Sequence, residues 1–522
     1  MSNGDQGSTS STNSSEVVGS KGIVKKVELV RLMVEALHTL GYKNSGKFLE
    51  QESGLPLCSN KMNLFMQQII EGQWDESTET LKMISQSLEN ITMTDLSAIL
   101  KASVLIYEQK FFEFLDRGNF MEACRTLRTA IPSLCHNHDR VHELSLYILW
   151  PPPDIKPRVQ LLEDIKHLLP TKVMVPKNRL VDLVEKVLEK QKRDCLFHNP
   201  LSVEHLSLLS DHMCEGEGIP RRTSQILVDH KDEVWLLKFS HNGRYLASSS
   251  RNRVVIIWEV QAGGQLSVIQ KLSCFNKPVE QISWSPNDLQ FLTCASGQYV
   301  LRWDVLSFKL LHGYGKSGLT TVSCGWHPDG DSILASFNNQ TVTWWNLKGE
   351  ELNWCYKALT YRRNAYLEIP RNMRELVITC TGKMIVFLGL ESFSLRFIVE
   401  DKIIVSFSIS RHGKFCLVSL ANERIHLYST EEGGHQLKRV AKYKGHKRRR
   451  FDVGSCLGGF EERFVASGSE DSQVYIWHRD SGKLVRRLEG HGAVVNCVSW
   501  NPVNPHMLAT GSDDRTIRIW ST

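Results

Sequence analysis

The strongest constraint on the fold is an internal repeat of about 40–45 residues in the second half of the chain. A strand-like run that ends near an aromatic residue recurs at intervals of 41 to 49 residues, at Trp258, Trp303, Trp345, Phe387, Tyr428, Trp477 and Trp520. A second mark, at the end of the first strand of a unit, recurs at Phe239, Trp284, Trp326, Ile409 and Trp500. This period with a closing aromatic is typical of a four-stranded propeller blade. We therefore expect a seven-bladed all-β propeller over residues 224–522.

The last repeat unit indicates how the ring closes. Its closing residue, Trp520, is followed by two residues, so this unit has no outer strand of its own. The segment Ser224–Val228 has strand character and precedes the first complete unit. We expect it to pair with the last unit, because this pairing would remove an open sheet edge.

Several units also contain the residues of a buried hydrogen-bonded chain. The last unit has His491, Thr510, Asp514 and Trp520, and the sixth has His446, Ser467, Asp471 and Trp477. The first has His230, Ser248 and Trp258, with Asn252 in place of the aspartate. Together with the Gly-His pairs, this pattern resembles the WD40 repeat. A hydrolase would need an exposed nucleophile beside its base, and no G-x-S-x-G elbow is present, so we expect a structural role and no catalytic residue.

The first half of the chain is predicted to be helical. Apolar residues from Leu29 to Leu40 follow one helical stripe, and Gly41-Tyr42 separates it from a second short helix. Two short helices cannot close a core, so we expect the stripe to meet a second copy of itself. The alternative is packing against the helices that follow. Residues 26–58 resemble the LisH dimerisation motif, which implies an interface at Leu37, Leu40, Tyr42, Phe48 and Leu49.

The remaining helices are assigned by resemblance and by order along the chain. Residues 59–118 resemble a CTLH domain through Ile70-Glu71-Gly72-x-Trp74 and the run Tyr107–Asn119, in a helix that we expect Asp95 to cap. Residues 119–192 stand where CRA-like helices follow CTLH. We expect residues 1–25 to be a disordered tail and 193–223 to be a linker, both from composition.

The cysteine pattern predicts no metal site and no cofactor. The 13 cysteines include no C-x-x-C pair, and we recognise no Cys/His spacing of the zinc-finger type. Cys135, His136, His138 and His142 lie at a helix junction, and we interpret them as exposed or hydrogen-bonded histidines. Gly313–Gly318 matches G-x-G-x-x-G but precedes a strand, which indicates a turn rather than a phosphate site. With no signal peptide or apolar run of membrane-spanning length, we expect a cytoplasmic and nuclear protein that does not insert into membranes.

One loop of the propeller half is strongly basic. Residues 441–450 contain six Lys or Arg residues and lead into the sixth repeat. We expect one propeller face to dock partners through Arg251, Arg253, Arg362, Arg363, Lys447, Arg448, Arg449 and Arg450. Acidic protein segments rank first as ligands, ahead of a solvated loop, and nucleic acid ranks last because no aromatic residues interleave the cluster.

In this order, LisH, CTLH, CRA-like helices and a WD40 propeller resemble the WD-repeat subunit of the GID/CTLH E3 ubiquitin ligase. The resemblance implies a non-catalytic scaffold for substrates or regulators. Its implied partners are a second copy, a Ran-binding-protein-like scaffold and RING-bearing CTLH subunits. One alternative is a cullin-4 substrate receptor, although Trp303-Asp304-Val305-Leu306 and Trp477-His478-Arg479-Asp480 do not fit its Trp-Asp-x-Arg pattern. The other is a signalling scaffold for G-protein subunits or transcriptional corepressors.

Overall fold

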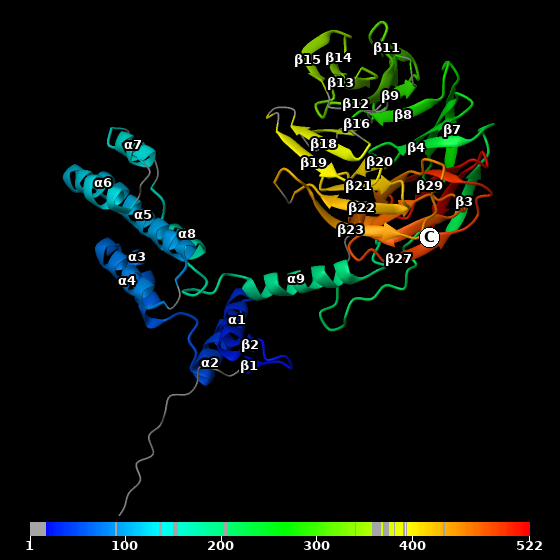
Figure 1. Cartoon of the computed structure of the whole chain (residues 1–522). Helices are drawn as coiled ribbons and strands as arrows, with labels where there is room; N and C mark the ends of the chain where they lie inside the picture. The colour runs from blue at the N-terminus through cyan, green and yellow to red at the C-terminus, as the bar shows by residue number, and fades with distance from the viewer. Residues whose placement is uncertain are drawn as a thin grey trace, which may run out of the picture. The chain divides into compact units, whose positions relative to one another are not determined.

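The computed structural model divides the chain into two compact units, residues 1–187 and 188–522, and we describe each by itself (Figure 1). It describes residues 17–522 except for 89–90, 135–137, 150–154, 202–205, 296, 298, 340, 358–366, 369–374, 380–381, 390–391, 393 and 432–433. Cys135, His136, Arg362 and Arg363 therefore lie outside the described residues. Within the described part of the chain, no helix combines the length and the apolar character needed to span a bilayer.

The first unit begins with a hairpin and two helices. Strands β1 (Val17–Val18) and β2 (Val24–Lys25) pair antiparallel, so this stretch differs from the disordered tail expected for residues 1–25. Gly19 and Gly22 both have positive φ angles, which lets the chain reverse within five residues. Helix α1 (Lys26–Thr39) and helix α2 (Lys43–Ser53) follow directly.

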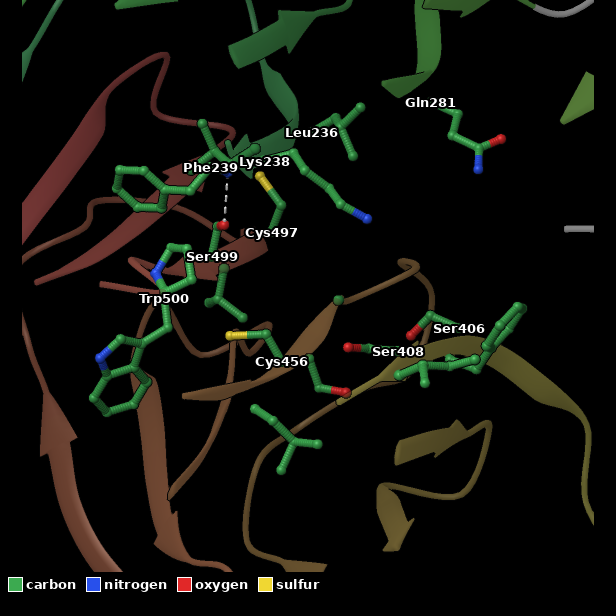
Figure 2. A pocket seen from close by; sticks show the side chains of 18 of the residues that line it. Leu236, Lys238, Phe239, Gln281, Ser406, Ser408, Cys456, Cys497, Ser499 and Trp500 are labelled. Atoms are coloured by element: carbon green, nitrogen blue, oxygen red, sulfur yellow. Dashed lines mark hydrogen bonds between the residues drawn. The ribbon is translucent and has the colours of Figure 1, made fainter. Parts of the chain in front are cut away.

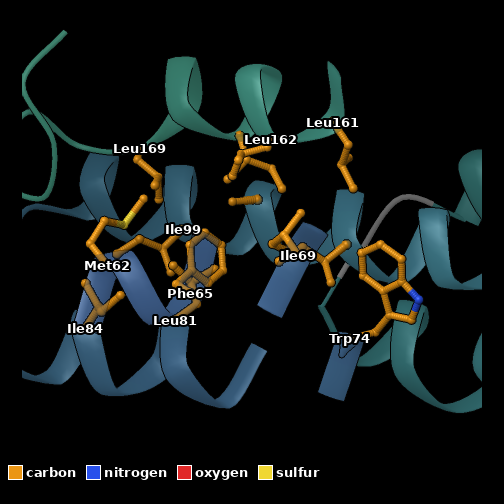
Figure 3. Close-up of a cluster of buried hydrophobic side chains, with 13 residues drawn as sticks. Met62, Phe65, Ile69, Trp74, Leu81, Ile84, Ile99, Leu161, Leu162 and Leu169 are labelled. Carbon is orange, nitrogen blue, oxygen red and sulfur yellow. The ribbon is translucent and has the colours of Figure 1, made fainter. Parts of the chain in front are cut away.

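Four helices of the first unit enclose its larger core (Figure 3). They are α3 (Asn60–Glu71), α4 (Trp74–Gln86), α5 (Met93–Asp116) and α8 (Arg158–Leu168). The core side chains include Met62, Phe65, Ile69, Trp74, Leu81, Ile84, Ile99, Leu161, Leu162 and Leu169. Helix α5 begins earlier than expected, because Thr92 is its cap and Asp95 completes a capping box from the third helical position.

An arginine clamp joins these four helices. The Arg158 guanidinium donates two hydrogen bonds, of 2.7 and 2.6 Å, to the Glu113 carboxylate and one of 2.9 Å to the Ile70 carbonyl. Its Cζ atom also lies 5.2 Å from the Trp74 ring centroid. Partial burial opposes ionisation of Glu113, but the Arg158 hydrogen bonds outweigh it and lower the pKa of this carboxyl.

A second apolar cluster joins α5 to α6 (Phe120–Leu134) and α7 (His138–Leu146). Phe111, Leu115, Ala123, Leu127, Ile131 and Leu144 form it. The last helix, α9 (Arg179–Asp194), is amphipathic and has no buried side chain. These helices occupy the places of the predicted CTLH and CRA-like segments, and those two assignments remain predictions.

The second unit is the expected seven-bladed propeller, in which seven four-stranded antiparallel sheets follow one another along the chain (Figure 1). Each closing aromatic, Phe387 included, lies in the third strand of its sheet. Phe239, Trp284, Trp326, Ile409 and Trp500, which the sequence places at the ends of first strands, are the last residues of the first strands of their sheets. Blades one to three comprise β4 (Val234–Phe239), β5 (Tyr245–Ser250), β6 (Val255–Val260), β7 (Leu266–Leu272); β8 (Val279–Trp284), β9 (Gln290–Ala295), β10 (Val300–Asp304), β11 (Leu310–Tyr314); and β12 (Thr321–Trp326), β13 (Ser332–Phe337), β14 (Thr341–Asn346), β15 (Glu351–Lys357).

Blades four to seven follow the same order from the inner to the outer strand. They comprise β16 (Leu367–Glu368), β17 (Glu375–Thr379), β18 (Met384–Gly389), β19 (Leu395–Val399); β20 (Ile404–Ile409), β21 (Phe415–Leu420), β22 (Arg424–Ser429), β23 (Lys438–Lys444); β24 (Ser455–Gly458), β25 (Phe464–Ser467), β26 (Val474–His478), β27 (Leu484–Leu488); and β28 (Val495–Trp500), β29 (Leu508–Ser512), β30 (Ile517–Ser521), β3 (Arg222–Leu227). A short 3₁₀ helix, η1 (Phe460–Glu462), lies between β24 and β25.

The ring closes as the sequence predicts. Strand β3 pairs antiparallel with β30, with Leu227 opposite Ile517 and Arg222 opposite Ser521. Neighbouring blades are also tied by indole groups at the ends of first strands. Trp284 Nε1 donates to the Lys238 carbonyl at 3.2 Å, and Trp326 Nε1 donates to the Ser283 carbonyl at 3.1 Å. Because β3 and β30 pair, the first and last strands of the propeller belong to one sheet.

The segment before β3 differs from the linker expected for residues 193–223, because much of it is attached to the propeller. The buried Asn199 side chain donates to the carbonyls of Gly218 and Pro505 at 2.7 and 2.9 Å and accepts from Phe460 N at 2.7 Å. Ile219 is fully buried in the apolar cluster of blades six and seven. Composition does not reveal this attachment, since it depends on a few specific residues such as this amide and this isoleucine.

Candidate partner-binding surfaces

The helix pair α1 and α2 presents large apolar side chains to solvent. Leu40, Tyr42 and Phe48 are 66%, 62% and 66% exposed. Leu37 and Leu49, the other two residues of the predicted interface, are half-buried. The structure therefore separates the expected set into three side chains available to a partner and two that are partly covered within the unit.

Close packing of α1 on α2 fixes how these side chains are presented. Gly46 is buried, and a Cβ atom at this position would lie 2.9 Å from His38 Nε2, so glycine allows the helices to approach. Glu35 Oε1 accepts hydrogen bonds from Thr39 Oγ1 at 2.7 Å and from Asn178 N at 2.9 Å, which ties α1 to the start of α9. The exposed apolar residues thus lie on a supported hairpin.

Blade seven contains the complete hydrogen-bonded chain that the sequence predicts. His491 Nδ1 donates to Asp514 Oδ2 at 2.8 Å, and His491 Nε2 lies 2.8 Å from Thr510 Oγ1. Trp520 Nε1 donates to the same hydroxyl at 2.8 Å. Partial burial opposes ionisation of Asp514, but hydrogen bonds from His491 and Thr516 hold its pKa well below the usual range. The four groups satisfy one another and leave no nucleophile for chemistry.

Blade one contains the shorter chain expected of it. His230 Nε2 lies 2.7 Å from Ser248 Oγ, to which Trp258 Nε1 donates at 2.8 Å. Asn252 caps its own turn by accepting from Val254 N at 3.2 Å. His230 Nδ1 is buried, and no described residue hydrogen-bonds it.

Blade six differs from the prediction, because the expected chain through His446, Ser467, Asp471 and Trp477 does not form. The Tyr475 hydroxyl donates to Asp471 Oδ2 at 2.7 Å and takes the carboxylate that His446 would have used. Trp477 Nε1 donates to the Lys444 carbonyl, and Ser467 Oγ donates to the Gly468 carbonyl. The position of Tyr475 is occupied in blade seven by Arg518, which leaves Asp514 to the histidine.

The basic loop between β23 and β24 is organised by one carboxylate that sequence reasoning missed. Glu470 Oε1 accepts the backbone N–H groups of Arg449, Arg450 and Phe451 at 2.5, 2.6 and 2.9 Å. Burial opposes ionisation of Glu470, but these three hydrogen bonds outweigh it and lower the pKa. A sequence signal does exist, since Glu470-Asp471 occupies the same turn as Asp513-Asp514 in the next repeat.

The predicted docking arginines do not all face solvent. Arg448 is a correction, because its side chain is only 10% exposed and donates to Asp452 Oδ1 at 2.7 Å. Arg251 is exposed but forms an ion pair of 3.0 Å with Glu233. Lys447, Arg449, Arg450 and Arg253 are exposed, and so is Arg515 in the β29–β30 turn.

These five cations share one end of the propeller, which we call the basic face. In an antiparallel blade, the turn between the second and third strands lies at the same end as the loop that leads into the first strand. Backbone hydrogen bonds join such turns and loops, from Glu470 N to the Lys447 carbonyl at 2.9 Å and from Arg251 N to the Glu233 carbonyl at 3.0 Å. The arrangement suits an extended acidic ligand.

First strands of the propeller line a cavity of about 440 Å³ (Figure 2). Its lining mixes apolar residues with polar ones such as Lys238, Ser406, Ser408 and Ser499, and Ser499 Oγ accepts from Phe239 N at 3.2 Å. Burial raises the pKa of the Cys456 thiol to about 12, so this sulfur stays protonated and unreactive near neutrality. The cavity offers polar contacts rather than an activated nucleophile.

Comparison with known proteins assigns both halves. A family model described as the WDR26 Lis-homology domain matches residues 15–59, which includes the β1–β2 hairpin. A model described as WD domain, G-beta repeat matches residues 221–259, 437–478 and 482–521. These three segments correspond to blades one, six and seven, in which the sequence shows the histidine sets.

Full-length relatives decide the family. The chain is 44% identical to a WD repeat-containing protein 26 homolog of Arabidopsis thaliana over 517 residues, which cover 97% of this chain and 86% of the relative. The chain belongs to the WD repeat-containing protein 26 family. It is also 30% identical to GID complex subunit 7 of Schizosaccharomyces pombe, with 95% of this chain and 97% of that protein covered. The likeness runs through the helical half and the propeller of these family members.

A solved structure supports the fold of the propeller half. The β-propeller domain of Cps50 (Swd1) of Myceliophteria thermophila matches with a TM-score of 0.50 and 18% identity. The match covers 58% of this chain and all of that domain. At this level of identity the likeness concerns the propeller fold, which many functions share.

Proposed function

We propose that this WD repeat-containing protein 26 family member is a non-catalytic scaffold subunit of a multi-subunit, RING-type GID/CTLH E3 ubiquitin ligase. The observation that carries the proposal is the similarity to GID complex subunit 7, which extends over nearly the whole of both chains. A scaffold of this kind would hold substrates or regulators near a RING module on another chain and so promote their ubiquitination and degradation. Its compartments would be the cytoplasm and the nucleus.

The helical half would provide the assembly contacts. Leu40, Tyr42 and Phe48 form an apolar surface that water solvates poorly, and the LisH match supports pairing with a second copy. A Ran-binding-protein-like scaffold and RING-bearing CTLH subunits are the further partners that we propose. The α5 region would contact them, since its CTLH assignment rests on the same resemblance.

The first test is affinity purification of the tagged full-length chain from cells of its own organism. Recovery of RING-bearing and Ran-binding-protein-like subunits in stoichiometric amounts is expected. Recovery of a cullin-4 adaptor instead would favour the substrate-receptor alternative, and recovery of G-protein subunits or corepressors would favour the signalling scaffold. Either of the last two results, without RING subunits, would contradict the proposal.

The propeller would recruit acidic protein segments through its basic face. Reversing two exposed charges, with Arg449→Glu and Arg450→Glu, should weaken binding of a labelled octaglutamate peptide by about tenfold or more at low salt. The expected cause is lost attraction together with new repulsion, and fluorescence anisotropy on the full-length chain would measure it. Because Glu470 binds the backbone of these residues, the substitutions should leave the loop conformation in place.

A matched control comes from β23, the outer strand that leads into the basic loop. Lys438→Glu and Arg439→Glu change the same number of exposed charges at the opposite end of β23. This variant should bind the peptide within about twofold of the original chain, because the added charges lie away from the basic face. Equal weakening by both variants would show that net charge alone, rather than a docking surface, governs binding.

A further inference from the structure

Two cysteines and two histidines meet in the segment between α9 and β3, within the propeller unit. The Sγ atoms of Cys195 and Cys214 and a ring nitrogen of His212 all lie within 4.8 Å of one another. His212 Nε2 is 3.2 Å from Cys214 Sγ, and His198 Nδ1 is 3.7 Å from the same sulfur. The two imidazole rings stand edge to face with centroids 4.6 Å apart. Three ligand atoms thus lie together, and His198 adjoins one of them through Cys214.

Their separations suit a tetrahedral zinc ion. Zinc binds thiolate sulfur at about 2.3 Å and imidazole nitrogen at about 2.0–2.1 Å, which places sulfur and nitrogen ligands about 3.5 Å apart in a tetrahedron. The two sulfur–nitrogen distances in the structure, 3.2 and 3.7 Å, lie on either side of this value. Two thiolates with two neutral imidazoles also balance the charge of the ion.

The spacing of the four ligands contains no C-x-x-C pair. Cys195-x-x-His198 supplies one pair and His212-x-Cys214 supplies the other, with thirteen residues between the pairs. Within each pair the two residues are close enough in sequence for both side chains to reach the same ion. Each is mixed, and for that reason neither resembles the familiar Cys-Cys or His-His half of a zinc finger.

The surrounding chain positions these groups on the propeller. His198 is almost fully buried, and its ring lies edge-on to Phe460 with centroids 6.2 Å apart. The backbone of the next residue, Asn199, accepts from His506 Nε2 at 2.7 Å. On the far side, Arg486 Nη2 donates to the Gly216 carbonyl at 3.2 Å. Both ligand pairs therefore adjoin residues that are fixed to blades six and seven.

The described residues 206–211, which precede the second pair, have little else to order them. Leu208, Leu209 and Met213 are 68%, 99% and 87% exposed, and no regular helix or strand is formed from residue 206 to residue 214. A segment without an apolar core needs a crosslink or a metal to hold one conformation. We propose that Cys195, His198, His212 and Cys214 bind one zinc ion in a closed, structural site that fastens residues 195–198 and 212–214 to each other and to the propeller.

Metal analysis of the full-length chain, expressed alone so that no RING subunit contributes zinc, tests this assignment. Mass-spectrometric elemental analysis is expected to find one zinc per chain. The double variant Cys195→Ser/Cys214→Ser should contain less than about a tenth of that amount. Cys274→Ser, which removes an exposed thiol in the propeller, should retain all of it.

Two further variants keep the test decisive if the double serine variant fails to fold. His198→Cys replaces one zinc ligand by another and should keep one zinc per chain. His198→Ala should instead lower the apparent zinc affinity, measured by competition with a chromophoric chelator, by at least about tenfold. His412→Ala, at an exposed site in blade five, should change neither quantity.

Chelation gives an independent structural readout. A protease that prefers leucine should cleave beside Leu208 and Leu209 about tenfold faster or more once the ion is removed. Added zinc should restore the slower cleavage. The proposal is overturned by a chain that contains no zinc and takes up none. It is equally overturned by full zinc content in the double serine variant, or by a Cys195–Cys214 disulfide in the metal-free protein that is purified without oxidants.

Discussion

Replacing Leu40, Tyr42 and Phe48 together by alanine is expected to leave the full-length chain monomeric at micromolar concentration, because the pairing that we propose uses these side chains. These three side chains are each more than three-fifths exposed on the α1–α2 hairpin, so the folded monomer loses few contacts by their removal. Mass photometry or analytical ultracentrifugation across a concentration series would measure the change. The expected shift in dissociation constant is at least about a hundredfold.

The size of this effect follows from symmetry. Burying a large apolar side chain contributes about 1.5–3 kcal/mol, and a two-fold interface uses the same surface on both copies. Each substitution is therefore counted twice. Even if two-thirds of the gross gain is offset by the cost of association, a loss of about 3 kcal/mol or more remains, which is a factor of more than a hundred.

The control removes exposed apolar surface from the propeller instead. Leu306→Ala and Val503→Ala change side chains that are 77% and 59% exposed, so this double variant has a comparable effect on surface hydrophobicity. It should associate like the original chain. If the LisH triple variant also keeps its oligomeric mass, the hairpin is not the pairing surface, and packing against the downstream helices becomes the better explanation of its apolar stripe.

The propeller was predictable because its signals repeat. The third strand of each blade has a closing aromatic residue, and most first strands end in an aromatic or apolar residue. These marks recur at a period that a single blade could not establish. The closing pair of β3 with β30 could be predicted as well, since Ser224–Val228 has no other unit to complete. Repetition makes such predictions independent of any one residue.

Predictions at single sites failed where one neighbouring side chain competes. Nothing in the spacing of His446, Ser467, Asp471 and Trp477 shows that Tyr475 takes the aspartate. In the same way, Arg448 stands between basic residues in the sequence, yet Asp452 turns it inward. Such outcomes depend on the rotamers of the side chains and on which of two possible donors reaches the carboxylate. Sequence patterns do not encode these properties directly.

The segment at residues 193–223 failed for a different reason. Its composition is that of a linker, and its order comes from a few specific anchors: the Asn199 amide, the buried Ile219 and Arg486, which donates to the Gly216 carbonyl. The cysteine and histidine pairs lie within the same stretch. Their spacing was visible in the sequence, but the proximity of the two pairs is a property of the fold.

Mild acid is expected to destabilise the propeller through two buried histidines. Burial lowers the pKa of His230 to about 4 and that of His446 to about 4, against 6.5 for an unhindered histidine. Asp229 and Lys271 act on His230, and Glu423, Arg448 and Asp471 act on His446, but burial has the larger effect on both. The free energy of unfolding should therefore fall as the pH is lowered from 6.5 toward 4.

The sign and size follow from proton uptake. Between pH 6.5 and 4 the unfolded chain carries protons on these two imidazoles and the folded chain does not, so acid favours unfolding. The stabilisation is complete above pH 6.5. Each histidine should contribute a loss of about 2 kcal/mol by pH 5 and about 3 kcal/mol by pH 4, since one pKa unit corresponds to about 1.4 kcal/mol. Carboxylates with lowered pKa values, such as Asp514, add losses only at still lower pH.

Urea unfolding of the full-length chain between pH 7.5 and 5, followed by tryptophan fluorescence, would report mainly on the propeller, because all but two of the 13 tryptophans lie at or after Trp235. The variant His230→Gln/His446→Gln should be less stable at pH 7.5 but should lose a large part of the dependence on pH between 6.5 and 5. A remainder is expected, because burial also lowers the pKa of His478. His412→Gln/His435→Gln, which changes two exposed histidines, should keep the full dependence. An unchanged pH slope in the first variant would show that the acid sensitivity arises elsewhere, and that the burial of these two imidazoles is compensated by water or by a local opening of the blades.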